Sequence, residues 1–181
     1  MSLKNTEHRY GSISIMLHWF MLLLMIATYT FIECRVFFEK GTDTRDLFKM
    51  WHFMLGLSVL CVVLIRIYFR FSQETPKITP SLNNIQAKAA KLGHVLLYIL
   101  MVGLPLSGWF MLSAFGKPIP FFGLELPPLT SVDKALGGSI HDIHELVGTI
   151  GYYLIGLHAL VALLHHYVMK DDTLLRMLPK K

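Results

Sequence analysis

Four histidines lie in segments of the sequence that otherwise consist almost entirely of apolar residues. His18 lies in the first such segment, His52 opens the second, and His144 and His158 lie in the last. Ionisable side chains within a membrane span are costly and usually serve a function. Because imidazole nitrogens ligate metals and haem iron, these four histidines are candidate ligands.

The spacing of the last two histidines decides how many centres they could serve. Fourteen helical residues return to within about 40° of the starting face and advance about 21 Å along the axis. His144 and His158 therefore lie on one face of a helix, but they cannot share one ion, because metal–nitrogen bonds are only about 2 Å long. We expect each to serve a separate centre.

Depth along the helices suggests a partner for each of them. A haem in a helical bundle takes one axial histidine from each of two facing helices at matched depth. His52 and His144 both lie at the start of their segments on one side, whereas His18 and His158 lie nearer the other side. We predict His52 and His144 around an outer haem and His18 and His158 around an inner one; His94 remains an alternative to His18.

The elements that must position these residues are four apolar stretches. They span Ile13–Ile32, Met50–Phe69, Leu92–Leu112 and Ile143–Met169, each near or above the roughly 20 residues that cross a bilayer core. The chain is 54% hydrophobic and 16% charged, which argues against an ordinary soluble domain. In lipid, backbone N–H and C=O groups must be hydrogen-bonded within the protein, either in helices or in a closed β-barrel. Because these runs show no alternation of apolar and polar residues, we expect helices. We predict a single domain over residues 1–181, an all-α integral membrane four-helix bundle holding two haems.

Charge predicts the orientation. An even number of spans puts both termini on one side, and eleven of the 17 lysine and arginine residues lie there: Lys4, Arg9, Arg66, Arg70, Lys77, Lys88, Lys91, Lys170, Arg176, Lys180 and Lys181. The positive-inside rule therefore predicts cytoplasmic termini. Because the basic residues are spread along membrane-flanking segments, we expect contact with anionic lipid and no binding of nucleic acid.

Glycines lie close to the candidate ligands. Gly56 and Gly148 follow His52 and His144 by four residues, which leaves room for a flat macrocycle one turn deeper on the same face. Gly151 and Gly156 could do the same between the haems. Close packing of helices is an equally good explanation of these glycines.

Other charged residues are candidates for binding the ends of the cofactors. Arg35, Arg66 and Arg70 flank the spans and could bind haem propionates. Alternatively, Arg66 and Arg70 only mark the cytoplasmic side, and Arg35 pairs with a surface glutamate. His165 and His166, at the inner end of the last span, are candidates for handling protons, although an interfacial position alone would also explain them.

Several motifs resemble one family over essentially all 181 residues. LHW in the first span, a histidine that opens the second, and the C-terminal GLHALVALLHHYVMKDDTLLRMLPKK resemble the prokaryotic cytochrome b561 family, and within it the enterobacterial superoxide oxidases. The resemblance implies a bacterial inner-membrane protein with two haems b, whose ligands at the matching positions are His18, His52, His144 and His158.

The resemblance also implies a function. In superoxide oxidases, electrons from periplasmic superoxide pass through the outer and inner haems to ubiquinone. We therefore expect a superoxide:quinone oxidoreductase, without assigning a catalytic residue. Because a quinone takes up two protons with its two electrons, His165 is a candidate for the quinone site. The alternative is a cytochrome b subunit that carries electrons from a partner dehydrogenase or hydrogenase to quinone. A histidine-lined transporter is disfavoured, because Pro105 interrupts only one half of the chain.

Overall fold

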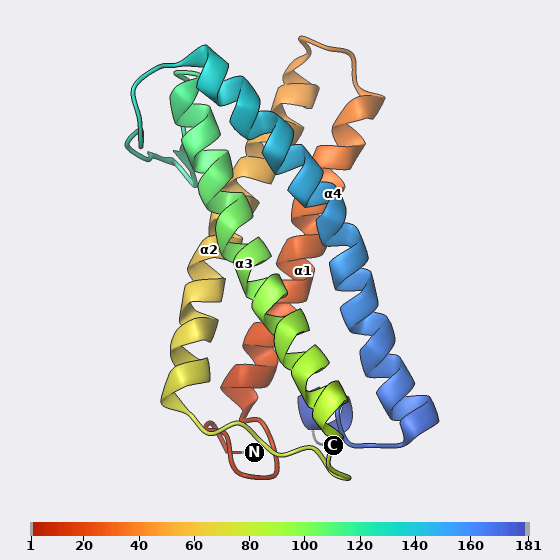
Figure 1. The fold of residues 1–181 in the computed structure, drawn as a ribbon. Helices are drawn as coiled ribbons and strands as arrows, with labels where there is room; N and C mark the ends of the chain where they lie inside the picture. The colour runs from red at the N-terminus through yellow and green to blue at the C-terminus, as the bar shows by residue number, and fades with distance from the viewer. Residues whose placement is uncertain (1, 180–181) are drawn as a thin grey trace.

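Four long helices make up most of the structure, a computed structural model that describes residues 2–179. They are α1 (Ser12–Cys34), α2 (Asp43–Ser72), α3 (Asn84–Ala114) and α4 (Lys134–Leu164), which continues into a π-helical turn over His165–Met169. Each is long and apolar enough to cross a membrane, and together they run up and down as a bundle (Figure 1). The predicted four-helix membrane fold is confirmed; Lys180 and Lys181 lie outside the described residues.

Three helices begin earlier than the apolar stretches predicted. The second begins at Asp43 instead of near residue 50, the third at Asn84 instead of 92, and the fourth at Lys134 instead of 143. Polar caps extend them: the side chains of Thr42, Asn83 and Asp133 accept backbone N–H groups of the first turns. Hydropathy locates the part of a helix that lies in lipid, whereas caps decide where the helix begins.

The helices pack in chain order, α1 on α2, α2 on α3 and α3 on α4. Apolar side chains of the first three helices form the main core; its buried members are Met21, Leu24, Met25, Val59, Leu60, Val62, Val63, Leu97, Leu100 and Met101. In α4 the buried residues are only Gly137 and Gly151. Over the described chain, α4 makes few close backbone approaches to α1 or α2, so its face toward them is hardly covered by protein.

The two ends of the bundle differ. Both termini lie at the lower end in Figure 1, and the loops after α1 and α3 lie at the upper end. The upper loop contains a short hairpin, β1 (Pro120–Phe121) and β2 (Leu124–Glu125), which the sequence had not predicted. Its two turn residues, Phe122 and Gly123, have φ values of 48° and 87°, the left-handed pair that tight hairpin turns require.

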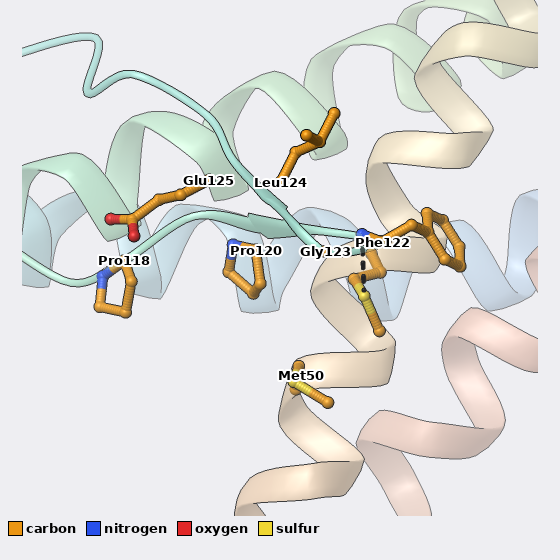
Figure 2. Close-up of a pocket in the computed structure, with 8 residues that line it drawn as sticks. Met50, Pro118, Pro120, Phe122, Gly123, Leu124 and Glu125 are labelled. Atoms are coloured by element: carbon orange, nitrogen blue, oxygen red, sulfur yellow. Dashed lines mark hydrogen bonds between the residues drawn. The ribbon is translucent and has the colours of Figure 1, made fainter.

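This hairpin packs on the upper half of α2. The Phe122 N–H donates to the sulfur of Met54 at 3.4 Å, as the dashed line in Figure 2 marks. Between hairpin and helix runs an open groove of about 480 Å³, lined by Met50, Met54 and hairpin residues. Ile119, just before the hairpin, is only 2% exposed. The loop therefore covers the α2–α3 side of the upper half of the bundle.

Candidate functional site

The upper half of the bundle brings His52 of α2 and His144 of α4 face to face. Their ring centroids are 6.3 Å apart and their planes cross at 79°. Both rings line one cavity, together with Gly56, Gly108 and Ile119. We call these two residues the upper pair.

Hydrogen bonds orient both rings of the upper pair. His52 Nδ1 lies 2.9 Å from the backbone oxygen of Thr28, and because a carbonyl only accepts, Nδ1 carries the hydrogen. His144 Nδ1 lies 2.9 Å from the Ser107 hydroxyl. A hydrogen bond from one ring nitrogen leaves the other, Nε2, with a free lone pair, as in most metal-ligating histidines.

The lower half brings together a second pair, His18 of α1 and His158 of α4. Their centroids are also 6.3 Å apart, with planes at 56°; we call them the lower pair. His94, the alternative partner, has its centroid 5.5 Å from that of His158 and donates from Nδ1 to the Ala90 carbonyl at 2.7 Å.

Both pairs match the spacing that a six-coordinate haem iron requires. Two iron–nitrogen bonds of about 2.0 Å, each followed by about 1.1 Å to the ring centre, would put two imidazole centroids about 6.2 Å apart. The upper and lower pairs have this separation, whereas His94 and His158 are closer. Spacing therefore favours His18 over His94 as the partner of His158.

The surroundings of the two pairs fit a haem unequally. The upper cavity, of about 40 Å³, would hold only a small part of a macrocycle. In the lower pair, Arg66 Nη2 lies 3.2 Å from His18 Nδ1. Because a guanidinium only donates, this nitrogen accepts, which is the reverse of the arrangement in the upper pair. Iron binding at His18 Nε2 would require Arg66 to turn away.

The glycines divide into two kinds. A Cβ added to Gly56, Gly148 or Gly156 would meet nothing within 4 Å, which is consistent with clearance for a flat group. A Cβ on Gly151 would lie 2.3 Å from the hydroxyl of Tyr29, and that hydroxyl donates to the Gly148 carbonyl at 3.0 Å. Gly151 therefore leaves room for the Tyr29 side chain of α1 against α4, and the expectation that it clears space for haem is wrong.

The three candidate propionate-binding arginines occupy different surroundings. Arg66 is half-buried and also donates to the Leu17 carbonyl at 3.3 Å. Arg70, at the lower end of α2, is exposed. Arg35 donates to the Ile32 carbonyl and, among the described residues, forms no ion pair with a glutamate. Only Arg35 and Arg70 are therefore free of contact with a candidate ligand.

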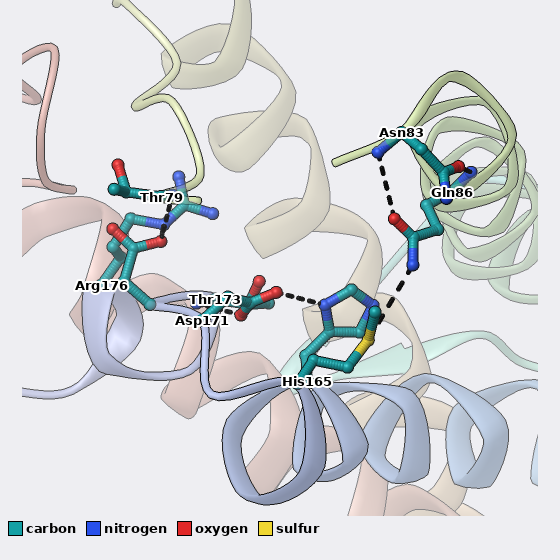
Figure 3. Close-up of polar contacts among 9 residues, drawn as sticks. Thr79, Asn83, Gln86, His165, Asp171, Thr173 and Arg176 are labelled. Atoms are coloured by element: carbon teal, nitrogen blue, oxygen red, sulfur yellow. Dashed lines mark hydrogen bonds and ion pairs between the residues drawn. The ribbon is translucent and has the colours of Figure 1, made fainter. Parts of the chain in front are cut away.

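His165 lies at the lower end, where the C-terminal residues fold back under the bundle. Its Nδ1 is 2.5 Å from the carboxylate of Asp171, which is 5% exposed and also accepts the Thr173 N–H at 2.9 Å (Figure 3). Burial would raise the pKa of Asp171, but hydrogen bonds from His165 and Thr173 outweigh it and hold the pKa below its usual value. The carboxylate is therefore ionised beside the His165 ring at neutral pH.

Sequence reasoning missed the residues that hold the candidate ligands in place. Ser107, Gly108 and Asp171 had no assigned role, although Pro105, Ser107 and Gly108 together interrupt an apolar run and could have drawn attention to this part of α3. In the part of the chain that the structure describes, no cluster of three or more histidine, cysteine or carboxylate side chains could hold a bare metal ion. The upper histidines thus form a pair, and at the lower end His94 lies beside the pair of His18 and His158.

Comparisons with known proteins agree with this arrangement. The family model described as prokaryotic cytochrome b561 matches residues 9–180. Cytochrome b561 homolog 1 of Escherichia coli K12 is 37% identical over 174 residues, which cover 96% of this chain and 99% of that protein. A Yersinia pestis protein named probable superoxide oxidase CybB is 38% identical over 173 residues, covering 96% and 97%.

A third relative, cytochrome b561 homolog 2 of Escherichia coli K12, is 30% identical over 181 residues, which cover 99% of this chain and 96% of that protein. These matches extend over nearly the whole of each chain and include all four spans. The chain therefore belongs to the prokaryotic cytochrome b561 family, whose members bind b-type haem and carry electrons across membranes.

Proposed function

We propose that the chain binds two haems b, one between His52 and His144 and one between His18 and His158. The observation that carries this proposal is the separation of 6.3 Å in both pairs, the spacing of two axial imidazoles on one iron. The two rings of α4 are fourteen residues apart, so the two sites lie at different depths along one helix. When bound, the haems would supply two one-electron carriers that connect the two ends of the bundle.

The bundle then lies in a bacterial inner membrane with its lower end in the cytoplasm. Two features support this orientation: both termini lie at the lower end, and most lysines and arginines of the sequence flank that end. Positively charged flanking segments stay on the cytoplasmic side. The upper pair then lies near the periplasm.

The electron donor proposed is superoxide and the acceptor is ubiquinone. Two superoxide anions each give up one electron and leave as O₂, and one ubiquinone takes two electrons and two protons to become ubiquinol. The name of the Yersinia pestis relative, a probable superoxide oxidase, supports this donor. Quinone is the acceptor that a membrane-embedded lower site can reach from lipid.

At the upper end, Arg35 is the residue that would attract an anionic donor. Arg35 follows the last residue of α1, the helix whose Thr28 carbonyl accepts from His52, so it lies at the same end of the bundle as the upper pair. The upper loops carry more acidic than basic residues overall, and attraction of superoxide must therefore be local to Arg35. Local positive charge can raise the association rate of an anion even where the net charge is unfavourable.

At the lower end, His165 and Asp171 would supply protons to the quinone. The ionised Asp171 carboxylate holds the His165 Nδ1–H, which leaves Nε2 as the nitrogen that exchanges a proton with an acceptor. The pair lies where the last span ends, the level at which a quinone headgroup meets the cytoplasmic surface. His165 is thus positioned to pass protons, while Asp171 fixes its ring.

The test is to mix purified, oxidised protein with superoxide by stopped flow and then to follow ubiquinol formation with no partner protein present. Rapid haem reduction with one ubiquinol formed per two superoxide anions is expected. A protein that holds two haems but ignores superoxide would contradict this donor and favour the alternative, an electron-transfer subunit that receives electrons from a dehydrogenase or hydrogenase.

A further inference from the structure

The third helix carries neither histidine of the upper pair, yet one of its turns contacts the ring of His144. The hydroxyl of Ser107 lies 2.9 Å from His144 Nδ1 and 2.8 Å from the Leu104 carbonyl. Gly108 follows, and a Cβ there would lie 3.3 Å from His144 Cε1. Ser107 thus provides a polar contact, and Gly108 provides the room that lets the ring reach it.

The direction of these hydrogen bonds follows from the number of hydrogens. A serine hydroxyl has one hydrogen, and the Leu104 carbonyl can only accept, so Ser107 donates to Leu104. The remaining bond to His144 must then run from the ring: Nδ1–H donates and the Ser107 oxygen accepts. This chain fixes His144 in the tautomer whose Nε2 lone pair is free.

We propose that Ser107 is the positioning residue of the upper haem, which fixes the tautomer and ring plane of His144 and lowers the reduction potential of that haem. This inference rests on the proposed haem sites. A hydrogen bond from the far ring nitrogen makes a ligating imidazole more basic, and a more basic axial ligand favours ferric over ferrous iron. The second bond, to Leu104, polarises the hydroxyl and strengthens the first.

Ser107 is also the only side chain in this role at the upper pair among the described residues. The partner of His52 is the backbone carbonyl of Thr28, which no substitution of a side chain removes. A change at Ser107 therefore alters one axial ligand of one haem. If electrons enter at the upper haem, a lower potential there favours their onward transfer to the lower haem.

The test compares Ser107→Ala with Ser58→Ala. The Ser58 hydroxyl makes the same kind of bond, to the Met54 carbonyl of its own helix at 2.9 Å, and no bond to a histidine is found for it, so it is a matched control. In each purified variant, haem per chain, the midpoint potentials of both haems and the low-temperature electron paramagnetic resonance (EPR) spectrum are measured. A His52→Ala variant identifies which signal belongs to the upper haem.

We expect Ser107→Ala to keep both haems, to raise the potential of the upper haem alone and to shift its EPR signal, because that signal depends on the angle between the axial rings. Ser58→Ala should match the parent protein. Unchanged potentials and spectrum in Ser107→Ala would overturn the inference. If the parent protein holds no haem, the proposed function itself fails, which is a separate result.

If Ser107→Ala loses the upper haem, a third variant, Ser107→Thr, tests the role of the hydroxyl, because threonine keeps it. Retention of the haem by Ser107→Thr, with the parent potential, would show that the hydroxyl positions His144. Loss in both variants would show that the site requires only the size of serine, and this result would also overturn the inference.

Discussion

Replacement of Gly151 by alanine tests how the Tyr29 side chain of α1 packs against α4. An added Cβ would lie 2.3 Å from the Tyr29 hydroxyl and 2.9 Å from a methyl carbon of Leu100. Either Tyr29 must move, which breaks its bond to the Gly148 carbonyl, or the helices must separate. The variant should therefore be less stable even though alanine is the better helix former.

The size of the effect follows from three contributions. Overpacking costs about 1–3 kcal/mol and the lost hydrogen bond about 1 kcal/mol, and these are opposed by about 1 kcal/mol of helix propensity. The net loss is about 1–3 kcal/mol. For a chain of this length each kcal/mol lowers the thermal midpoint by about 2–4 °C, so a fall of several degrees is expected.

The assay is thermal unfolding in detergent followed by circular dichroism, with Gly103→Ala as the control. Gly103 lies on an exposed part of α3, and a Cβ there meets nothing within 4 Å, so its midpoint should not fall. In a Tyr29→Phe background the cost of Gly151→Ala should shrink, because the closest clashing atom is gone. An equal cost in both backgrounds, or a Gly151→Ala midpoint no lower than that of Gly103→Ala, would refute the packing described.

Two further predictions concern the ends of the bundle. Arg35→Gln should lower the second-order rate constant for reduction by superoxide about two- to tenfold and weaken its dependence on salt, as measured by stopped flow. Lys40→Gln, which removes an equal charge from the same loop, should have a smaller effect; equal effects would exclude local attraction by Arg35. The pKa of Asp171 is lower in the folded than in the unfolded protein. The ionised carboxylate therefore stabilises the fold above the unfolded-state pKa of about 3.9. This stabilisation is lost as the pH falls through the folded-state pKa. Hydrogen exchange of residues 170–178 should therefore increase below about pH 4, beyond the intrinsic pH effect, whereas in Asp171→Asn it should be high already at pH 7; parallel pH profiles in the two proteins would contradict this linkage.

The spans could be predicted from the sequence because lipid imposes a simple rule. Twenty apolar residues in a row must form a helix that crosses the bilayer, and the four stretches lie within the four helices found. The candidate histidines could be grouped by depth for the same reason, since depth follows from a count of residues along a helix. Their role as iron ligands stays a prediction.

Features that depend on contacts between distant segments could not be predicted in this way. The hairpin turn uses Phe122 and Gly123 in place of the more common Asn-Gly pair, and its position depends on Met54 of another helix. The contact of Ser107 with His144 joins α3 to α4, and the pairing of Asp171 with His165 depends on a C-terminal segment that folds back on itself. A serine or an aspartate in the sequence indicates none of these partners.

The most direct test of the two-haem arrangement is haem per chain, determined by pyridine haemochrome in the purified protein and in two variants. The parent protein should hold two haems b. His144→Ala should keep only the lower haem, and His18→Ala should keep only the upper haem, so that the two variants differ in midpoint potential. A parent protein with one haem or none, or a His144→Ala variant that loses both haems or neither, would contradict the pairing of His52 with His144 and of His18 with His158.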